Sequence, residues 1–448
     1  MKKAFVLILS ALLISSCLPQ NIQVPQSPLL PLLERKSGLI GYVGIDGNVY
    51  ISDQGGGNPA QLTQDAALPQ GSGNPFLLYE YPTWSRDGSE LAFVGVSSDG
   101  KQTQSKVMVV NVDNNSANEI YTSKSAVPIY LNWSPDNARL NFTSSDVSSQ
   151  NVILQSVPSQ GGTPTILDVG SPYYWSWAPD GRQMIVHAGG AGTSVPEHVA
   201  FLSVDSTTVT EQALDSSSAS FGPLSSVAAQ AFQAPAWSPD GSRIALARVS
   251  EKENQIIVTD TAGKNPKKIG TFTSKAAFAW SSDGTRIAYL DGIRPMNPGI
   301  FGPLHVVDLE TSKEISEDGN IIAFFWSPNG EKLAYFNLVK MQASGSSSGS
   351  SGDTQATTQL AVELYVLDVT SEKSQKLLTY IPTDLFLSIL PYFDQYHQAV
   401  TIWSPDNNNL VLSLVDDTNG PSIAVIAATG NLQPRTLANG YLAFWSWK

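Results

Sequence analysis

Short apolar runs separated by turn residues recur along the chain, and this pattern predicts an all-β protein. In the clearest copy, residues 235–245 read PAWSPDGSRIA, so an apolar run ends at a tryptophan, a polar turn follows and a second apolar run begins. Proline fixes φ at the first turn position, aspartate accepts backbone hydrogen bonds, and glycine adopts positive φ without steric cost. The motif therefore predicts two antiparallel strands joined by a tight turn.

The same motif recurs along most of the chain and predicts a ring of similar units. Asn137 and Asn407 replace the turn glycine in two copies, and asparagine is the next most tolerant residue of the left-handed region. Segments such as 107–112 and 268–269 then read as third and fourth strands. Four short antiparallel strands per unit of roughly 40–50 residues are typical of a propeller blade. Eight of the ten tryptophans are assigned to one position of the motif: Trp84, Trp133, Trp177, Trp237, Trp280, Trp326, Trp403 and Trp447.

The motif residues are expected to be structural. We expect each tryptophan to pack between neighbouring blades and each turn aspartate to hold its turn. The two ends of the chain predict how the ring closes. Residues 39–43, 48–52 and 60–63 read as second, third and fourth strands without a first, whereas 441–447 read as a first strand with nothing after it. Residues 38–448 are therefore predicted to form an eight-bladed propeller, closed by one C-terminal and three N-terminal strands. Seven blades remain the alternative if one weak repeat does not form a full blade.

The repeated motif resembles the WD40-like (PD40) repeat of TolB-type propellers and of the dipeptidyl-peptidase IV propeller. The resemblance runs from about Leu39 to Lys448. TolB-type proteins carry a six-bladed propeller behind an α/β domain, and the dipeptidyl-peptidase family has an eight-bladed propeller followed by a hydrolase domain. This chain has eight repeats, and we expect neither additional domain. The resemblance therefore implies the fold and leaves the function open.

The first residues predict export. Met1–Lys3 is a positive segment, residues 4–13 are apolar, and residues 14–17 (ISSC) resemble a bacterial lipobox. The resemblance implies a signal peptide over 1–16, a lipid on Cys17 and a flexible tether over 17–37. Cys17 is the only cysteine, so no intramolecular disulfide is possible. The alternative is an ordinary signal peptide with a cysteine there by chance. We expect an extracytoplasmic protein anchored to a membrane, in the periplasm or at the cell surface.

The longest connections follow the second and fourth strands, which places them on one face of a propeller disc. They are the segments 64–81, 187–198, 214–234, 290–303, 340–360 and 378–399. Long loops on a rigid scaffold often carry binding sites. Candidate binding residues in the two most aromatic segments are Phe76, Tyr79, Tyr81, Tyr380, Phe386, Tyr392, Phe393 and Tyr396. These residues either cap the blades and fill the central channel, or form an exposed patch for a protein or carbohydrate partner.

The matches to recognised catalytic motifs do not indicate an active site. The GxSxG match at 345–349 lies in a Ser/Gly tract rather than between a strand and a helix. The four histidines lack metal-site spacing, although His187 and His198 bound one loop and leave a metal pair open. The formal charge of −13 without basic clusters argues against nucleic acid as a partner.

We therefore expect no cofactor and a non-catalytic binding or assembly platform for a protein or cell-envelope polymer. The alternatives are a carbohydrate-active hydrolase or lyase acting at the channel mouth, and a purely structural envelope component. The enzyme alternative requires acidic or histidine side chains at the mouth.

Overall fold

The computed structural model describes residues 37–448 except 58, 72, 147, 150, 190–197, 205–208, 214–233, 250–251, 293, 296–299, 343–357, 417–419 and 431. The predicted signal peptide, Cys17 and the tether up to residue 36 lie outside the described residues. In the described part of the chain, no helix combines the length and the apolar character needed to cross a membrane.

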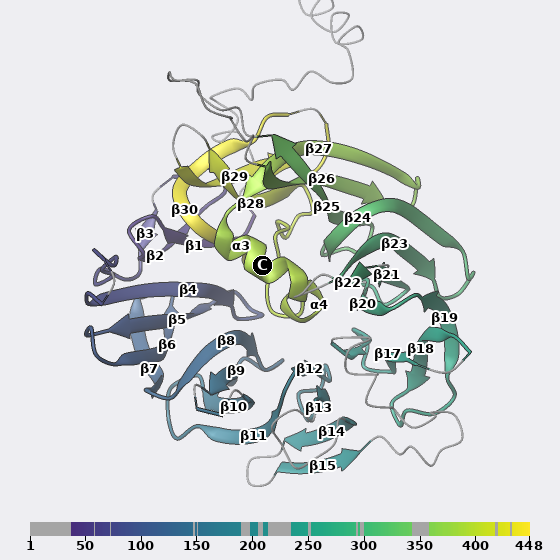
Figure 1. The fold of residues 1–448 in the computed structure, drawn as a ribbon, viewed down its shortest axis with the longest axis horizontal. Coiled ribbons are helices and arrows are strands. Elements are labelled where there is room, and N and C mark those ends of the chain that lie inside the picture. Colours follow the sequence, from purple (N-terminus) through teal and green to yellow (C-terminus); the bar gives the residue numbers. More distant parts are fainter. Residues whose placement is uncertain are drawn as a thin grey trace, which may run out of the picture.

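The chain forms a β-propeller in which antiparallel sheets radiate from a common centre (Figure 1). The first separate sheet contains β4 (Phe76–Trp84), β5 (Glu90–Ser98), β6 (Thr103–Asn111) and β7 (Ser116–Ser123). The second contains β8 (Ala126–Trp133), β9 (Arg139–Asp146), β10 (Val152–Pro158) and β11 (Thr165–Gly170). The third contains β12 (Tyr173–Trp177), β13 (Gln183–Ala188), β14 (His198–Val204) and β15 (Val209–Ala213). The fourth contains β16 (Ala236–Trp237), β17 (Arg243–Arg248), β18 (Asn254–Asp260) and β19 (Lys267–Phe272).

The remaining strands join into one continuous 14-stranded sheet. They are β20 (Lys275–Trp280), β21 (Arg286–Gly292), β22 (Arg294–Pro295), β23 (Ile300–Asp308), β24 (Glu314–Trp326), β25 (Lys332–Gln342), β26 (Thr358–Asp368), β27 (Lys373–Pro382), β28 (Asn409–Asp416), β29 (Gly420–Ala427), β30 (Arg435–Trp445), β1 (Ile40–Gly44), β2 (Val49–Ser52) and β3 (Ala60–Gln61). The sheet is continuous because β24, β27 and β30 each pair with one strand through their first part and with another through their last part. Each therefore serves as an outer and then an inner strand.

The two ends of the chain meet within this sheet. Strand β1 pairs with β30 on one side and with β2 on the other, and β2 then pairs with β3. This pairing joins one C-terminal strand to three N-terminal strands, as the sequence predicts. It also removes the free sheet edges that the unpaired ends would leave.

The register corrects the assignment of the last repeat tryptophan. Trp84 pairs with Leu91, seven residues later, and the same spacing holds for the other internal copies. At the C-terminus it is Trp445, not Trp447, that pairs with the first residue of β1, Ile40. Trp447 falls two positions later, where most copies have the turn proline. Trp445 is fully buried, whereas Trp447 is half-buried.

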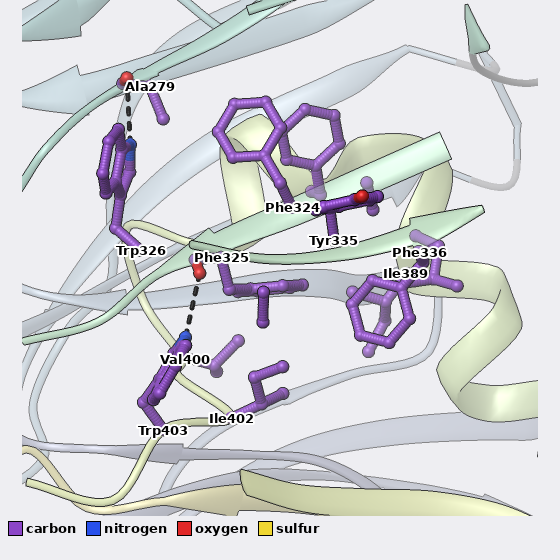
Figure 2. Packing of buried hydrophobic residues seen from close by; sticks show 14 of the residues in the cluster. Ala279, Phe324, Phe325, Trp326, Tyr335, Phe336, Ile389, Val400, Ile402 and Trp403 are labelled. Atoms are coloured by element: carbon purple, nitrogen blue, oxygen red, sulfur yellow. Dashed lines mark hydrogen bonds between the residues drawn. The ribbon is translucent and has the colours of Figure 1, made fainter. Parts of the chain in front are cut away.

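The tryptophans link neighbouring sheets at their inner strands. The Trp84 indole N–H donates to the Phe444 carbonyl at 3.2 Å, and Phe444 directly precedes Trp445. Four other indoles donate in the same way to the residue before the preceding repeat tryptophan: Trp133, Trp280, Trp326 and Trp403. Figure 2 shows two of these bonds among the buried side chains of the core. One residue type therefore fills the seam, the boundary between neighbouring sheets, and donates a hydrogen bond to a buried carbonyl.

The turns after the tryptophans also join around the ring. In one copy the Ser238 hydroxyl donates to Asp240 at 2.5 Å and accepts the Arg243 N–H at 2.9 Å. Gly241 of this turn has a positive φ of 71° and lies against Pro179 of the preceding turn. A side chain at Gly241 would strain the backbone, which explains the glycine. The turn motif therefore has a structural role in the fold.

Several predicted loops are ordered strands. Residues 76–84 form β4 and pair along most of their length with β5. The two ends of 340–360 extend the hairpin of β25 and β26, up to the pair Gln342–Thr358, and residues 343–357 lie outside the described residues. Within 290–303, β22 pairs with the start of β23. Most of 187–198 and 214–234, and the GxSxG match at 345–349, lie outside the described residues.

Candidate functional site

The centre of the ring is occupied by residues 383–400, called the central segment here. It contains α3 (Asp384–Ile389), the 3-10 helix η3 (Leu390–Tyr392) and α4 (Phe393–Tyr396), and these helices lie inside the ring of sheets (Figure 1). The segment interrupts an inner strand, because Pro382 pairs with Leu414 of β28 and Trp403 pairs with Leu410 of the same strand. The chain therefore leaves the sheet, crosses the channel and returns. Thr383 caps α3 by accepting the Phe386 N–H at 3.4 Å.

One side of the central segment is apolar and tightly packed. Phe386 and Phe393 are 1% and 0% exposed. The Phe386 ring lies 5.6 Å from Phe336 of β25, and the Phe393 ring lies 4.6 Å from Phe324 of β24. Figure 2 places Ile389 beside Phe336 in the same cluster. The expectation of an exposed patch is wrong for these side chains, and the alternative of a segment that fills the channel describes their position.

The opposite side of the segment makes polar contacts with inner strands. The Gln395 amide accepts the Trp175 N–H and donates to the Trp175 carbonyl, both at 2.8 Å. It thereby replaces a neighbouring strand at the free inner edge of β12. Asp394 accepts the Ala234 N–H at 2.9 Å, just before β16. These two side chains attach the segment to two of the separate sheets.

Two irregular inner strands supply further attachment points. Strand β8 skips Ile129 in its pairing with β9, and β30 shifts register beside Tyr441. The carbonyl of Ile129 accepts the Tyr396 hydroxyl, and the carbonyl of Tyr441 accepts the Thr383 hydroxyl. A bulge leaves one residue outside the ladder, so its carbonyl is free to face the channel.

Tyrosines and two carboxylates gather on this polar side. Tyr81 has a φ of 55° at an irregularity in β4, and its ring lies 6.3 Å from that of Tyr396. Tyr130 of β8 packs edge-on against Tyr396 at 5.1 Å. Positive φ is uncommon for a bulky residue and marks strain that the surroundings must support. The sequence identified Tyr81 and Tyr396 but gave no sign that they would meet.

Burial shifts the pKa values of the acidic groups here. Burial raises the pKa of Asp394 to about 7, partly offset by its backbone hydrogen bonds. Burial also raises the pKa of Glu80, and that of Tyr81 to about 12 with a further contribution from Glu80. A carboxyl group with a pKa near neutrality can exchange a proton at physiological pH. The sequence analysis did not single out Glu80 or Asp394, because nothing local distinguishes them from solvated acids.

The other end of the central segment meets Arg86, from the turn after β4. The Arg86 guanidinium donates to the Gln398 carbonyl and lies 4.5 Å above the ring of Trp447. Burial lowers the pKa of His397 to about 4, with Arg86 adding to the effect. The imidazole of His397 is therefore neutral at pH 7.

The remaining candidate binding residues lie in strands and in the central segment. Phe76 begins β4 and is half-buried, and Tyr392 of η3 and Tyr396 of α4 are half-buried as well. Tyr79 is 2% exposed, and its hydroxyl donates to Asp65 at 2.8 Å. Tyr380 is buried in β27. Tyr79 and Tyr380 are therefore part of the fold rather than surfaces for a partner.

The described residues hold no group of three or more His, Cys, Asp or Glu side chains that could bind a metal ion. The His198 Nε2 lies 2.6 Å from a carboxylate oxygen of Glu211, and His187 is buried near the ring of Tyr174. A small cavity of about 210 Å³ lies beside Arg243, Asp260 and Lys267. It is below the ~300 Å³ at which ligand pockets usually begin.

No protein-family model matches this chain, and no curated protein matches it in sequence. Several solved structures are similar. TolB from Acinetobacter baumannii is 12% identical and has a TM-score of 0.35, over 80% of this chain and 84% of TolB. The oligogalacturonate lyase from Vibrio parahaemolyticus is 13% identical and has a TM-score of 0.46, over 89% of this chain and 100% of the lyase.

The β-propeller domain of the Trilobed protease from Pyrococcus furiosus is also similar. It is 12% identical and has a TM-score of 0.45, over 82% of this chain and 99% of that domain. TolB, the name suggested by the repeat motif, is thus among the solved structures that this chain resembles. These proteins differ in activity, and nothing about the activity of this chain follows from the likeness.

Proposed function

We propose that the chain is an extracytoplasmic, lipid-anchored propeller of eight blades that binds or assembles a protein or cell-envelope polymer without catalysis. The observation that carries this proposal is the central segment, whose buried apolar residues occupy the middle of the ring. A filled centre favours a rigid scaffold over an axial active site. Partner binding is then assigned to the longer connections between strands. These lie on the face opposite the short turns, which is called the long-loop face here.

The number of blades is supported by the tryptophan register. Eight tryptophans, the last being Trp445, pair at equivalent positions with a following strand. Each such pair opens one blade, and the strands β1 to β3 complete the blade that Trp445 opens.

The entry point of the chain supports the orientation. The Ser37 carbonyl accepts the Trp445 indole N–H at 2.7 Å, and the Leu39 N–H donates to Ser446 at 2.9 Å. The described chain therefore enters the propeller on the face of the short turns. A lipid on Cys17 would be attached to this face, which leaves the long-loop face free for a partner.

Site-specific photo-crosslinking in native membranes tests this proposal. One crosslinker replaces Leu360, which is 44% exposed at the start of β26 on the long-loop face. The control replaces Glu310, which is exposed in a short turn on the opposite face. We expect a defined adduct with a protein or envelope polymer from position 360 and none from 310. Adducts from position 310 alone, or from neither position in folded protein, would contradict the proposal.

The anchor has a separate test. Cys17→Ser should move the protein from the membrane fraction to the soluble extracytoplasmic fraction, because the thiol that carries the lipid is lost. Retention of the variant in the membrane fraction would instead favour an uncleaved signal segment or another anchor.

A carbohydrate-active enzyme is the second candidate, and Glu80 and Asp394 favour it. Both carboxyl groups have raised pKa values beside the channel tyrosines. General acids in glycoside hydrolysis have raised pKa values. A screen of envelope polysaccharides with the wild type and Glu80→Gln tests this candidate. Cleavage by the wild type that the variant loses would support it, and no cleavage by folded wild type would count against it.

A further inference from the structure

Arg86 breaks the pattern of the turn motif. Five other copies have proline at this position: Pro135, Pro179, Pro239, Pro328 and Pro405. Proline cannot reach toward the channel, whereas the Arg86 side chain extends to the end of the central segment and contacts the Gln398 carbonyl. The adjoining C-terminal residue Trp447 also replaces a proline and lies under the guanidinium. A third copy has Ser282 at this position. The two large replacements, Arg86 and Trp447, therefore meet at one place, beside the end of the central segment.

The positive charge of Arg86 is not matched by a carboxylate. Arg286, in another turn, lies 3.6 Å from both Asp283 and Asp308. Among the described residues no such ion pair forms with Arg86, which is half-buried and whose pKa burial lowers. A partly desolvated cation without a counter-charge is unfavourable, so an anion here would offset that cost.

Neutral donors stand close to this charge. Tyr130 is 3% exposed, and its hydroxyl has no well-formed hydrogen bond among the described residues, although Asn132 and Gln395 are close to it. Arg86 is near enough to favour the ionised form of Tyr130. A buried hydroxyl normally has a partner. The place thus offers a cation, the buried Tyr130 hydroxyl and the neutral His397, with the Asp394 carboxyl also near Tyr130.

We propose that Arg86, Tyr130 and His397 form a binding site for a small carboxylate at the short-turn end of the channel. One cation suits a single negative charge. The planar guanidinium fork, with one nitrogen held by Gln398, matches the two oxygens of a carboxylate better than a tetrahedral dianion. The site lies at the opposite end of the channel from the long-loop face, so it is independent of the partner-binding surface.

The test uses the whole propeller and three probes: acetate, inorganic phosphate and chloride. Calorimetry gives the affinity, and NMR of the His397 ring reports the site, because a bound anion offsets Arg86 and should raise the His397 pKa. We expect acetate to bind more tightly than the other two. Arg86→Gln should weaken acetate binding at least tenfold and abolish the His397 shift.

The matched control is Arg243→Gln. Arg243 also lies over a tryptophan, 4.9 Å from the Trp280 ring, and donates to the Gly284 carbonyl at 2.9 Å, but it has Asp240 beside it. This variant should bind acetate as the wild type does. If Arg86→Gln does not fold, Tyr130→Phe removes only the hydroxyl and should weaken acetate binding several-fold.

Three results would overturn the assignment. They are no acetate binding by the wild type, equal binding by the Arg86 or Tyr130 variant, and preferential binding of phosphate. Equal loss of binding in Arg243→Gln would place the anion elsewhere on the ring.

Discussion

Two regions of the propeller use the same tryptophan motif with different results. Along the continuous sheet, indoles such as that of Trp403 donate to a carbonyl of the neighbouring inner strand at 2.9 Å. At the two seams beside the sheet of β12–β15, the indole nitrogens of Trp177 and Trp237 are buried without a hydrogen-bond partner among the described residues. The local motif therefore determines the position of each tryptophan in its strand. Whether its indole N–H bonds to the neighbouring sheet depends on how closely that sheet approaches.

The central segment contacts the region where these bonds are missing. Gln395 bonds to Trp175 of β12, and Asp394 bonds to Ala234 beside β16. On the continuous-sheet side the same segment contributes mainly apolar packing, through residues such as Phe393, beside the hydrogen bond from the Thr383 hydroxyl to the Tyr441 carbonyl. Polar side chains of the segment thus provide hydrogen bonds where the indoles of Trp177 and Trp237 make none. The polar and apolar sides of the segment can be tested separately.

The largest effect should come from the apolar side. Phe393→Ala removes a fully buried ring and should lower the free energy of unfolding by about 3–5 kcal/mol. Tyr392→Ala, next to it but half-buried, should cost clearly less. Urea unfolding of both variants measures the difference. Equal and small losses would mean that the ring is stable without its filled centre.

Asp394 should make stability depend on pH. Its pKa is 3.8 in the unfolded chain and about 7 in the fold. Its stabilising contribution is therefore complete below about pH 4 and is lost as pH rises to about 7. At about 1.4 kcal/mol per pKa unit, the loss amounts to a few kcal/mol.

Asp394→Asn should remove this slope, because the amide oxygen can still accept the Ala234 N–H. Unfolding is measured from pH 4 to 8, a range in which the turn aspartates do not titrate. Asp240, for example, has a pKa lowered to about 2 by hydrogen bonds from Ser238 and Ser242, so it stays ionised throughout. A variant with the same slope as the wild type would assign the pH dependence to another group.

Gln395→Leu tests the polar side of the segment. The change keeps the size of the side chain but leaves the Trp175 N–H and carbonyl unpaired, which should cost about 2–4 kcal/mol. Hydrogen exchange should accelerate in β12 and leave β25 unchanged. Faster exchange throughout the ring would mean that Gln395 supports the whole core rather than one seam.

The smallest effect compares two tryptophans directly. Trp403→Phe loses a seam hydrogen bond, and Trp177→Phe loses none, while both lose similar ring volume. Trp403→Phe should therefore be the more destabilising by about 1 kcal/mol. Thermal and urea unfolding of the pair give this difference. No difference, or the reverse order, would show that the seam bond does not contribute net stability.

Local chemistry in the sequence determined most of the sheet architecture. The turn motif and the apolar runs beside it are short-range features, so strands such as β17 and β21 could be predicted from their own residues. The closure by β1 and β30 followed from the incomplete repeats at both ends. The assignment of Trp447 could have been corrected from the sequence, because Trp445–Ser446 repeats the Trp–Ser pair of most other copies.

Tertiary structure alone decided the candidate sites. Gln395 meets Trp175 across 220 residues, and Arg86 meets Gln398 across 312. No local pattern encodes such contacts. Burial likewise turned Asp394 and Glu80 from ordinary acids into groups with raised pKa values, because desolvation depends on everything packed around them. The sequence thus determined the repeated strands, through turn chemistry that acts over a few residues. The path of the central segment through the ring was decided only when the sheets had assembled around it.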